Sequence, residues 1–357
     1  MIWFERGGNS RFGVVKRVGG LAMRRSLILG AVFLAVIALA DVLVWHWAVG
    51  IVARETEAWA QARRAEGWVV RMSAPDAAGW PLAARIHVRD VEVRVPASGL
   101  PGGVMVASAR ASIGVDLWAY RHLEIALDGA QRLQLGASAA IPYTAVRQVI
   151  AVDLPETGLA SAADIQIEGL SAILAPDAPP VAIGRANGRF VSVAGALRGS
   201  LEADDIDLPP SPVAAGMGSR IARISLDGAL VGAPQQTMAA WRDAGGRLTL
   251  RQFGLSWGQL GASGSADFHL DDALQPAGSI QADVTGTAET LDALAKAKLL
   301  APRAAMAAKA VLALLQRPQP DGPPSVSLPL ALQDRTLQMG RIPLVRLPEI
   351  VWTPARD

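Results

Sequence analysis

The sequence predicts a mainly β protein: an elongated, curved antiparallel sheet or sheets with a short helical insertion near the C-terminus, preceded by one transmembrane helix. Three observations lead to this prediction. Apolar and polar residues alternate over many short runs, turn-forming residues separate those runs, and one apolar run near the N-terminus is long enough to cross a bilayer. The 357 residues include no cysteine, so burial and strand pairing must hold an exported domain together.

The transmembrane helix is predicted over residues 26–52, where the first part of the run carries no charge. Asp41 is the one acid within it and lies near the outer end, where its carboxylate can reach interfacial water. A cleaved signal peptide is the competing reading, because the residues ending at Ala40 fit a small-x-small cleavage site. The translation start, at Met1 or at Met23, also stays open.

Residues 1–25 form a basic tail that includes Arg24 and Arg25. The positive-inside rule therefore places the tail in the cytoplasm and the rest of the chain across the membrane. Trp45 and Trp47 are predicted to mark the outer membrane interface, where aromatic belts lie. The tail holds six bases and one acid, so the remainder carries 28 bases (34 − 6) against 31 acids (32 − 1). The exported part lacks the basic character of a nucleic-acid-binding protein.

Residues 53–67 are predicted as a helical stalk that continues the membrane helix and can pack back on the sheet. Gly67 is the expected end of this helix. The helical spacing suggests the following stripe of residues for its packed side: Ile51, Glu55, Ala58, Trp59, Ala62 and Ala65.

Two periplasmic β-rich halves are predicted, residues 68–207 and residues 213–357, separated by the proline-rich segment 208–212. Within residues 85–95 the alternation changes phase near Asp90, which predicts a bulge or a tight bend. Further alternating runs occur at 113–117, 123–127, 165–167, 224–226, 248–257, 268–270 and 326–332. Turns are expected at Asp128-Gly129, Asn187-Gly188, Asp227-Gly228 and Gly245-Gly246.

Helices are predicted in two places in the exported part. Residues 139–150 are read as a short helix between strands. Residues 290–316 contain strong helix formers, with Thr290 as N-cap and Pro302 dividing the segment into two helices.

Several short motifs resemble the DUF2125 family, a bacterial group of membrane-anchored exported proteins of uncharacterised function. They are GRLTL at 246–250, FGLSWGQL at 253–260, ASG at 262–264, LDD at 270–272, PAG at 276–278, AGWPL at 78–82 and LQMGRIPL at 337–344. The resemblance implies a single-pass protein of the bacterial inner membrane, with its N-terminus in the cytoplasm and its bulk in the periplasm. The layout is more loosely similar to AsmA-like envelope proteins, which implies a role in lipid handling. No catalytic residue comes with either resemblance.

One motif is typical of serine hydrolases: residues 254–258 match the G-x-S-x-G nucleophile elbow, with Ser256 as nucleophile. The elbow needs a strand, a sharp turn and a helix, whereas β alternation continues on both sides here. His269 is the one histidine that follows it. We therefore expect Ser256 to face away from the core on an ordinary strand.

Metal and cofactor sites are not expected. His46, His87, His122 and His269 stand singly, without metal-binding spacing. The acidic cluster Glu202, Asp204, Asp205 and Asp207 lacks the pattern of a calcium loop and is read as a solvated turn. No glycine-rich phosphate loop is present.

These observations favour a non-enzymatic binding or scaffold protein in envelope biogenesis, anchored in the inner membrane, with an apolar β groove that binds lipid. A protein-docking module at the membrane is the alternative, and an exported serine hydrolase using Ser256 is a third hypothesis. The membrane bilayer is one expected partner, and a lipid ligand or an envelope protein is the other; nucleic acid is not expected. The sequence leaves open the ligand-binding residues, the partner, the oligomeric state, and whether the sheet is a groove, a sandwich or a barrel.

Overall fold

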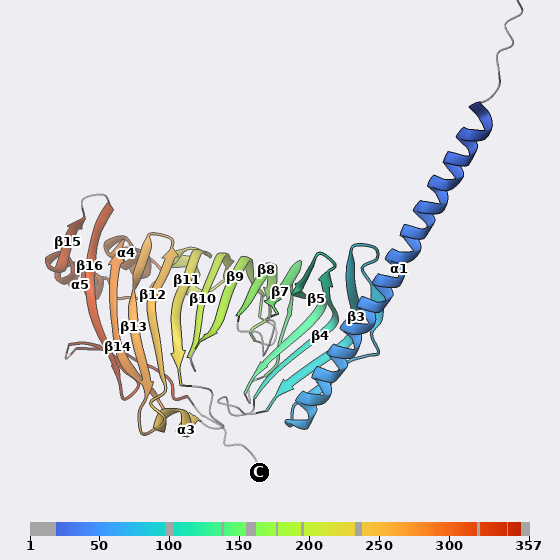
Figure 1. Cartoon of the computed structure of the whole chain (residues 1–357). Helices are drawn as coiled ribbons and strands as arrows, with labels where there is room; N and C mark the ends of the chain where they lie inside the picture. The colour runs from blue at the N-terminus through green and yellow to red at the C-terminus, as the bar shows by residue number, and fades with distance from the viewer. Residues whose placement is uncertain are drawn as a thin grey trace, which may run out of the picture.

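The structure is a computed structural model that describes residues 19–96, 103–136, 139–154, 162–175, 178–193, 196–232, 238–319, 322–340 and 342–350. One long N-terminal helix lies at one end of a single elongated, curved sheet, and small helices lie at the other end (Figure 1). The predicted fold class is confirmed by this arrangement.

Helix α1 (Gly19–Ala65) is one continuous element that includes both the predicted span and the predicted stalk. From Phe33 onward it is long and apolar enough to be a candidate membrane span or a signal sequence. Its N-terminal half projects clear of the sheet (Figure 1), and residues 33–40 are exposed. The helix ends before Gly67, as predicted, because the φ of 87° at this glycine is a left-handed conformation that closes many helices.

In the described residues, eighteen strands form one sheet. The first nine are β1 (Val69–Arg71), β2 (Asp76–Ala78), β3 (Ala83–Val95), β4 (Val104–Asp116), β5 (Ala119–Leu135), β6 (Ile141–Thr144), β7 (Arg147–Asp153), β8 (Ala162–Ala172) and β9 (Val181–Val193). The others are β10 (Ala196–Asp207), β11 (Arg220–Val231), β12 (Arg247–Trp257), β13 (Leu260–Leu270), β14 (Pro276–Thr285), β15 (Gln316–Gln319), β16 (Gly322–Gln333), β17 (Thr336–Met339) and β18 (Ile342–Arg346).

The strands form an antiparallel meander that follows the chain. Strands β1 and β2 both pair with β3, and the order then runs β3, β4, β5, with β6 and β7 sharing the next position. It continues through β8 to β14 and then to β16, whose other side pairs with β15 and β17; β18 pairs with β17. Such local connections give an open, single-layer sheet.

The predicted helix at residues 139–150 is wrong, because this segment forms β6 and the start of β7. Pairing on both sides, with β5 and with β8, outweighs the local preference for a helix. Three predicted turns also lie inside strands: Asp128-Gly129 in β5, Asn187-Gly188 in β9 and Asp227-Gly228 in β11. The predicted change of phase near Asp90 is a true irregularity, with a φ of 52° at this residue.

The sheet continues past the proline-rich segment that was predicted to separate two halves. Strands β10 and β11 pair from Ala196 and Val231 to Asp207 and Arg220, on either side of this connection. The connection contains α2 (Pro212–Met217), whose N-cap Ser211 accepts a hydrogen bond from the Ala214 amide at 3.1 Å.

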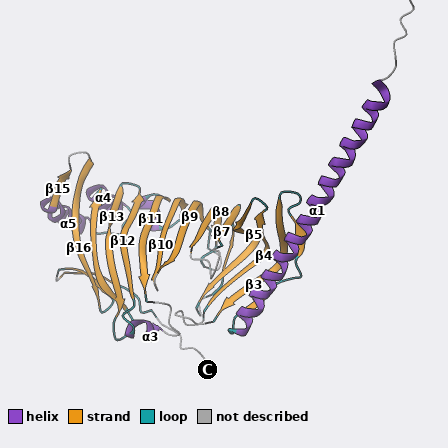
Figure 2. Cartoon of the chain, in the orientation of Figure 1, coloured by secondary structure: helices purple, strands orange, loops and turns teal. Residues whose placement is uncertain are grey.

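Three further short helices follow: α3 (Met238–Asp243), α4 (Thr287–Lys296) and α5 (Pro302–Leu315). Pro302 opens α5 as predicted, because a proline at this position loses no helical hydrogen bond. The predicted N-cap at Thr290 is wrong: α4 begins earlier, and its N-cap is Gly286 with a φ of 66°. Figure 2 shows these helices against the end of the sheet away from α1.

The most deeply buried core lies where α1 crosses the first strands. Val49 of α1 packs with Ile86 and Val88 of β3, and both strand residues are 1% exposed. The packed side of α1 runs through Val49 and Ala60, not through the predicted stripe, whose members Glu55, Ala58, Trp59, Ala62 and Ala65 are exposed. The helical periodicity was predicted correctly, but the side of α1 that faces the sheet was not. The position of the sheet decides which side of the helix is packed.

Candidate functional site

The two faces of the sheet differ sharply in chemistry. The strand register pairs each residue with a partner on the neighbouring strand. Two rows of such partners cross the sheet on the same face. The first row is Ile86, Ile113, Ile125, Ile150, Ile165, Gly188, Leu201, Leu226, Phe253, Gly264, Ala282 and Leu328. The second is Ala84, Val115, Leu123, Val152, Ala163, Phe190, Gly199, Gly228, Leu250, Ala266, Ile280 and Leu330.

We call the face that carries these two rows the apolar face. Every member of both rows is an apolar residue or glycine. Eleven intervals of about 4.8 Å between strands make each row roughly 50 Å long. The strands therefore present an unbroken apolar band from α1 to the far end of the sheet.

Among the residues that the structure describes, no helix packs over the middle of the apolar face. Leu201 and Leu226, partners in the first row, are 41% and 36% exposed. At the ends of the sheet the same face is covered: Ile86 beneath α1 and Val326 of β16 are 1% and 0% exposed. Helix α1 packs on β1, β3 and β4, while α4 packs on β13 and α5 on β16. Contiguous exposed apolar surfaces are typical of interaction sites, so this part of the apolar face is the candidate site.

The opposite face, which we call the polar face, carries cross-strand ion pairs. Examples are Arg85 with Glu124 at 3.0 Å, and Arg251 with Asp227 at 2.7 Å. Each exposed pair contributes only a few tenths of a kcal/mol, about 0.2–1. Their larger effect is on solvation, because charged side chains favour a solvent-exposed face. The apolar face is therefore the one suited to bind an apolar ligand.

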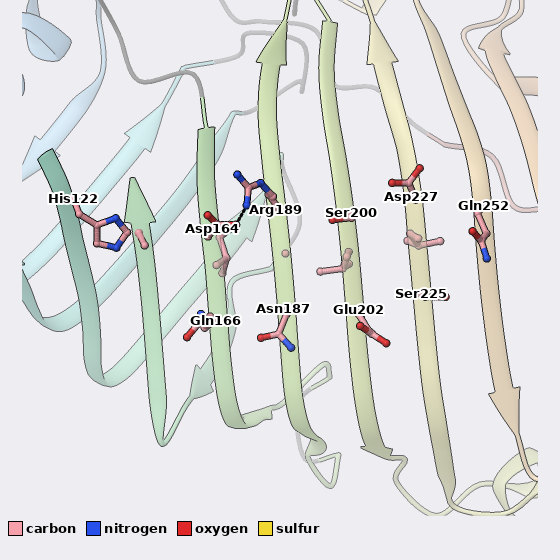
Figure 3. Close-up of a pocket in the computed structure, with 15 residues that line it drawn as sticks. His122, Asp164, Gln166, Asn187, Arg189, Ser200, Glu202, Ser225, Asp227 and Gln252 are labelled. Atoms are coloured by element: carbon pink, nitrogen blue, oxygen red, sulfur yellow. Dashed lines mark ion pairs between the residues drawn. The ribbon is translucent and has the colours of Figure 1, made fainter. Parts of the chain in front are cut away.

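A shallow hollow of about 620 Å³ lies across β5 to β12, and it is bordered mostly by polar-face residues together with Ile165, Gly188, Leu201 and Leu226 of the first row. Figure 3 shows its labelled side chains, with Asp164 and Arg189 joined as an ion pair at 3.7 Å. His122 lies at one end, and its Nδ1 is 2.9 Å from a carboxylate oxygen of Asp153. The hydrogen bond to Asp153 raises the pKa of His122 above its ordinary value.

The acidic cluster predicted as a turn lies in β10 and faces arginines of β11. Arg223 is 2.7 Å from Asp204 and 3.1 Å from Glu202, and Arg220 is 2.7 Å from Asp207. The hydrogen bond from Arg220 lowers the pKa of Asp207. Arginines of the neighbouring strand already pair with these carboxylates. The acidic residues therefore belong to a series of cross-strand ion pairs and do not form a turn.

Ser256 lies near the end of β12 and is exposed, on the polar face, as its strand position predicts. Its motif leads through Gly258 into the hairpin between β12 and β13, so no helix follows the serine. His269 is exposed in β13, with Ala277 as its partner in β14. The geometry therefore differs from the strand, turn and helix of a nucleophile elbow.

The two tryptophans that were predicted to mark the membrane interface have different surroundings. Trp47 is 67% exposed, whereas Trp45 is half-buried and its indole nitrogen donates a hydrogen bond to the Ala83 carbonyl at 3.0 Å. Trp45 therefore helps to attach α1 to β3, a role that the sequence did not indicate. Arg24 and Arg25 lie in α1, where their side chains fall outside the described residues.

The sequence identified many members of the apolar face one at a time, but not the rows that they form. Alternation marked Ile113, Ile125 and Phe253, whereas Gly188 and Gly228 were read as turns. The signal that was missed is spacing: each of these glycines stands two residues from apolar neighbours on its own strand.

Comparison with family models gives a match over most of the chain. A family model described as "Uncharacterized protein conserved in bacteria (DUF2125)" matches residues 45–348. No curated protein and no solved structure matches the chain. The looser likeness to AsmA-like proteins is not shown by these comparisons.

Proposed function

The chain belongs to the DUF2125 family, and we propose that it is a membrane-anchored periplasmic lipid-binding protein of the bacterial cell envelope. In this proposal α1 spans the inner membrane, and the apolar face of the sheet binds acyl chains without chemical conversion. The observation that carries the proposal is the unbroken apolar band, with Leu201 and Leu226 exposed at its middle.

The chemistry of the band fits an acyl chain. Each methylene group that leaves water for an apolar surface contributes about 0.8 kcal/mol, so a chain lying along several strands gains a substantial free energy. The band carries no charge that would select a polar ligand. Glycine at Gly188 and Gly199 gives space to the Phe190 ring, because a Cβ at these positions would lie 3.1 Å and 2.8 Å from ring carbons.

The position of α1 supports a lipid as the occupant. Val49 of α1 packs directly on Ile86 and Val88, which belong to the end of the apolar face. The exposed apolar part of the same helix, residues 33–40, lies less than five turns earlier in the chain. A lipid that leaves the bilayer along α1 therefore meets apolar surface without crossing the polar face.

The test is a charge placed at the middle of the band. Leu201→Asp puts a carboxylate in the first row, and its exposed position makes a folding defect small. Ser200→Asp is the matched control. Ser200 directly precedes Leu201 on the same strand, and its side chain points to the polar face, between its strand partners Arg189 and Asp227. We expect Leu201→Asp to lower the amount of phospholipid that co-purifies with the full chain at least tenfold, and Ser200→Asp to leave it unchanged. Equal lipid content in both variants would contradict the proposal.

A protein-docking function is the second candidate, and the free edge of the sheet favours it. All five residues of β18 are exposed, and the described chain pairs this strand with β17 alone. An extended segment of a partner could add to this edge. Crosslinking in cells separates the two functions: a stoichiometric protein adduct at β18 favours docking, whereas lipid adducts on the apolar face favour lipid binding.

A further inference from the structure

We propose that two turns of the sheet beside α1 insert aromatic side chains into the head-group region of the bilayer that α1 spans. The first turn is residues 79–82, between β2 and β3, and the second is residues 117–120, where β4 leads into β5. We call them the aromatic turns. The inference rests on the proposed function, because it requires α1 to span the membrane, and it adds a second point of contact with the bilayer.

The aromatic turns carry large, exposed side chains. Trp80, Trp118 and Tyr120 are 55%, 69% and 70% exposed. In the described part of the chain after α1, no other tryptophan, tyrosine or phenylalanine is more than half exposed. Leu82, in the first turn, is exposed as well. The exposed aromatic residues of the sheet are therefore concentrated in these two turns, and such a concentration is typical of an interaction surface.

Hydrogen bonds hold the aromatic turns beside Trp45 of α1. The Trp45 indole nitrogen donates to the carbonyl of Ala83, the residue that follows the first turn, at 3.0 Å. The Ala83 amide donates to the Gly79 carbonyl at 2.9 Å and closes this turn. The Leu117 amide donates to the Leu82 carbonyl at 3.2 Å and joins the second turn to the first. The two turns therefore lie side by side, next to Trp45.

The aromatic turns lie on the membrane side of Trp45. Trp45 contacts the start of β3, whereas the end of α1 leads through Gly67 into β1, which pairs with residues 92–94 near the end of β3. Helix α1 and β3 thus run in the same direction, so the residues before Ala83 lie toward the N-terminal half of α1. That half projects clear of the sheet (Figure 1) and contains the proposed membrane span.

The position of Trp45 matches the outer surface of a bilayer. A helix needs about 20 residues to cross the hydrocarbon core, and a span of that length from Ser26 ends at Trp45. Residues 33–40 and 42–44 are exposed, whereas Asp41, one helical turn before Trp45, is half-buried. Contact between α1 and the rest of the protein therefore begins where the span ends. Tryptophan and tyrosine favour this boundary because their rings are apolar and carry a polar group.

The bilayer is the occupant that this position favours. Residues 42–44 of α1, which immediately precede Trp45, are exposed and apolar. The aromatic turns therefore continue a surface that the membrane already covers in the proposed function. Ala84 and Val115, which are partners in the second apolar row, each lie two residues from a turn. Insertion of the turns places the bilayer surface at the α1 end of the apolar face, where lipid would arrive.

The experiment measures contact between the turns and lipid. The sequence has no cysteine, so one cysteine can be introduced and labelled at a time. The variants Trp80→Cys and Trp118→Cys of the full chain are labelled with the dye NBD and placed in phosphatidylcholine nanodiscs. Lipid with a doxyl group near its head group quenches a dye that lies in the outer part of the bilayer. Trp47→Cys is the reference on α1.

Leu135→Cys is the matched control in water. Leu135 is exposed and lies at the opposite end of β5 from Tyr120. Fifteen residues of extended strand separate the two, which is about 50 Å. The unfolding temperature of each variant checks its fold, and the exposed positions make a defect small. Tyr120→Cys replaces either turn variant if its unfolding temperature falls.

We expect the doxyl lipid to quench the dye at positions 80 and 118 about fivefold more strongly than at position 135, because the aromatic turns lie in the head-group region. Quenching at position 47 should be similar to that at positions 80 and 118. Bound iodide-accessible dye should also decrease at both turn positions when detergent is exchanged for nanodiscs, because lipid then excludes the aqueous quencher.

Three results separate the inference from the proposed function. Quenching at positions 80 and 118 that is no stronger than at position 135, with position 47 quenched, would overturn the inference and leave the proposed function standing. Dye at positions 80 and 118 that is protected from iodide but not quenched by doxyl lipid would assign the turns to a contact with a second copy of the chain, which also overturns the inference. No quenching at position 47 would reject the membrane span and both proposals with it.

Discussion

Two truncations on the same apolar row test whether its middle is uncovered. Ile86 and Leu201 both belong to the first row, but Ile86 is 1% exposed beneath α1 and Leu201 is 41% exposed. Ile86→Ala and Leu201→Ala each remove three carbon atoms from the side chain. The chemical change is therefore matched, and the two sites differ chiefly in what lies above them.

The expected costs differ by about 2 kcal/mol. Three buried carbon groups at about 0.8 kcal/mol each give about 2.4 kcal/mol for Ile86→Ala. The cavity left beneath α1 raises this cost to about 3–4 kcal/mol, within the range of buried truncations. Leu201 already meets solvent over nearly half of its surface, so its truncation should cost about 1 kcal/mol and leave no enclosed cavity.

Urea unfolding of the full chain in nanodiscs, followed by near-ultraviolet circular dichroism, measures both costs. A common slope of the unfolding curves, with shifted midpoints, would show that stability alone has changed. Costs that agree within about 0.5 kcal/mol would refute the reasoning, because they would mean that Leu201 is packed beneath a second layer, as Ile86 is.

Three further predictions concern single side chains. Trp45→Phe should destabilise the attachment of α1 by about 1 kcal/mol, because it removes the hydrogen bond to the β3 carbonyl; Trp47→Phe, at an exposed site, should change the unfolding midpoint little, and equal effects would contradict this assignment. The raised pKa of His122 means that its pair with Asp153 contributes fully below the ordinary histidine pKa and is lost as pH rises through the raised value; an NMR titration should show Asp153→Asn lowering the pKa of His122, and no change would count against the pair. A fluorophosphonate probe should leave the protein unlabelled, whereas labelling that Ser256→Ala abolishes would revive the hydrolase hypothesis.

The sequence predicted the architecture well because the alternation of the strands is local information. Residues 248–257 alternate clearly and form β12. The apolar run near the N-terminus and Gly67 likewise marked the course and the end of α1. Each of these features depends on residues that are close together in the sequence, so its prediction needed no knowledge of distant contacts.

The candidate site was harder to predict because it depends on pairing between strands. Gly188 becomes part of an apolar row only when β9 is placed beside β10, where its partner is Leu201. Residues 139–150 form strands because β5 and β8 pair with them from both sides.

The central claim is that acyl chains lie along the apolar face, and the most direct test is photochemical. A fatty acid with a diazirine near the end of its acyl tail is bound to the full-length protein and irradiated. The resulting adducts identify the side chains that the tail contacts. We expect adducts on Leu201, Leu226 and Phe253, which are neighbours in the first row. Adducts confined to the polar face or to α1, with none on these three residues, would contradict it.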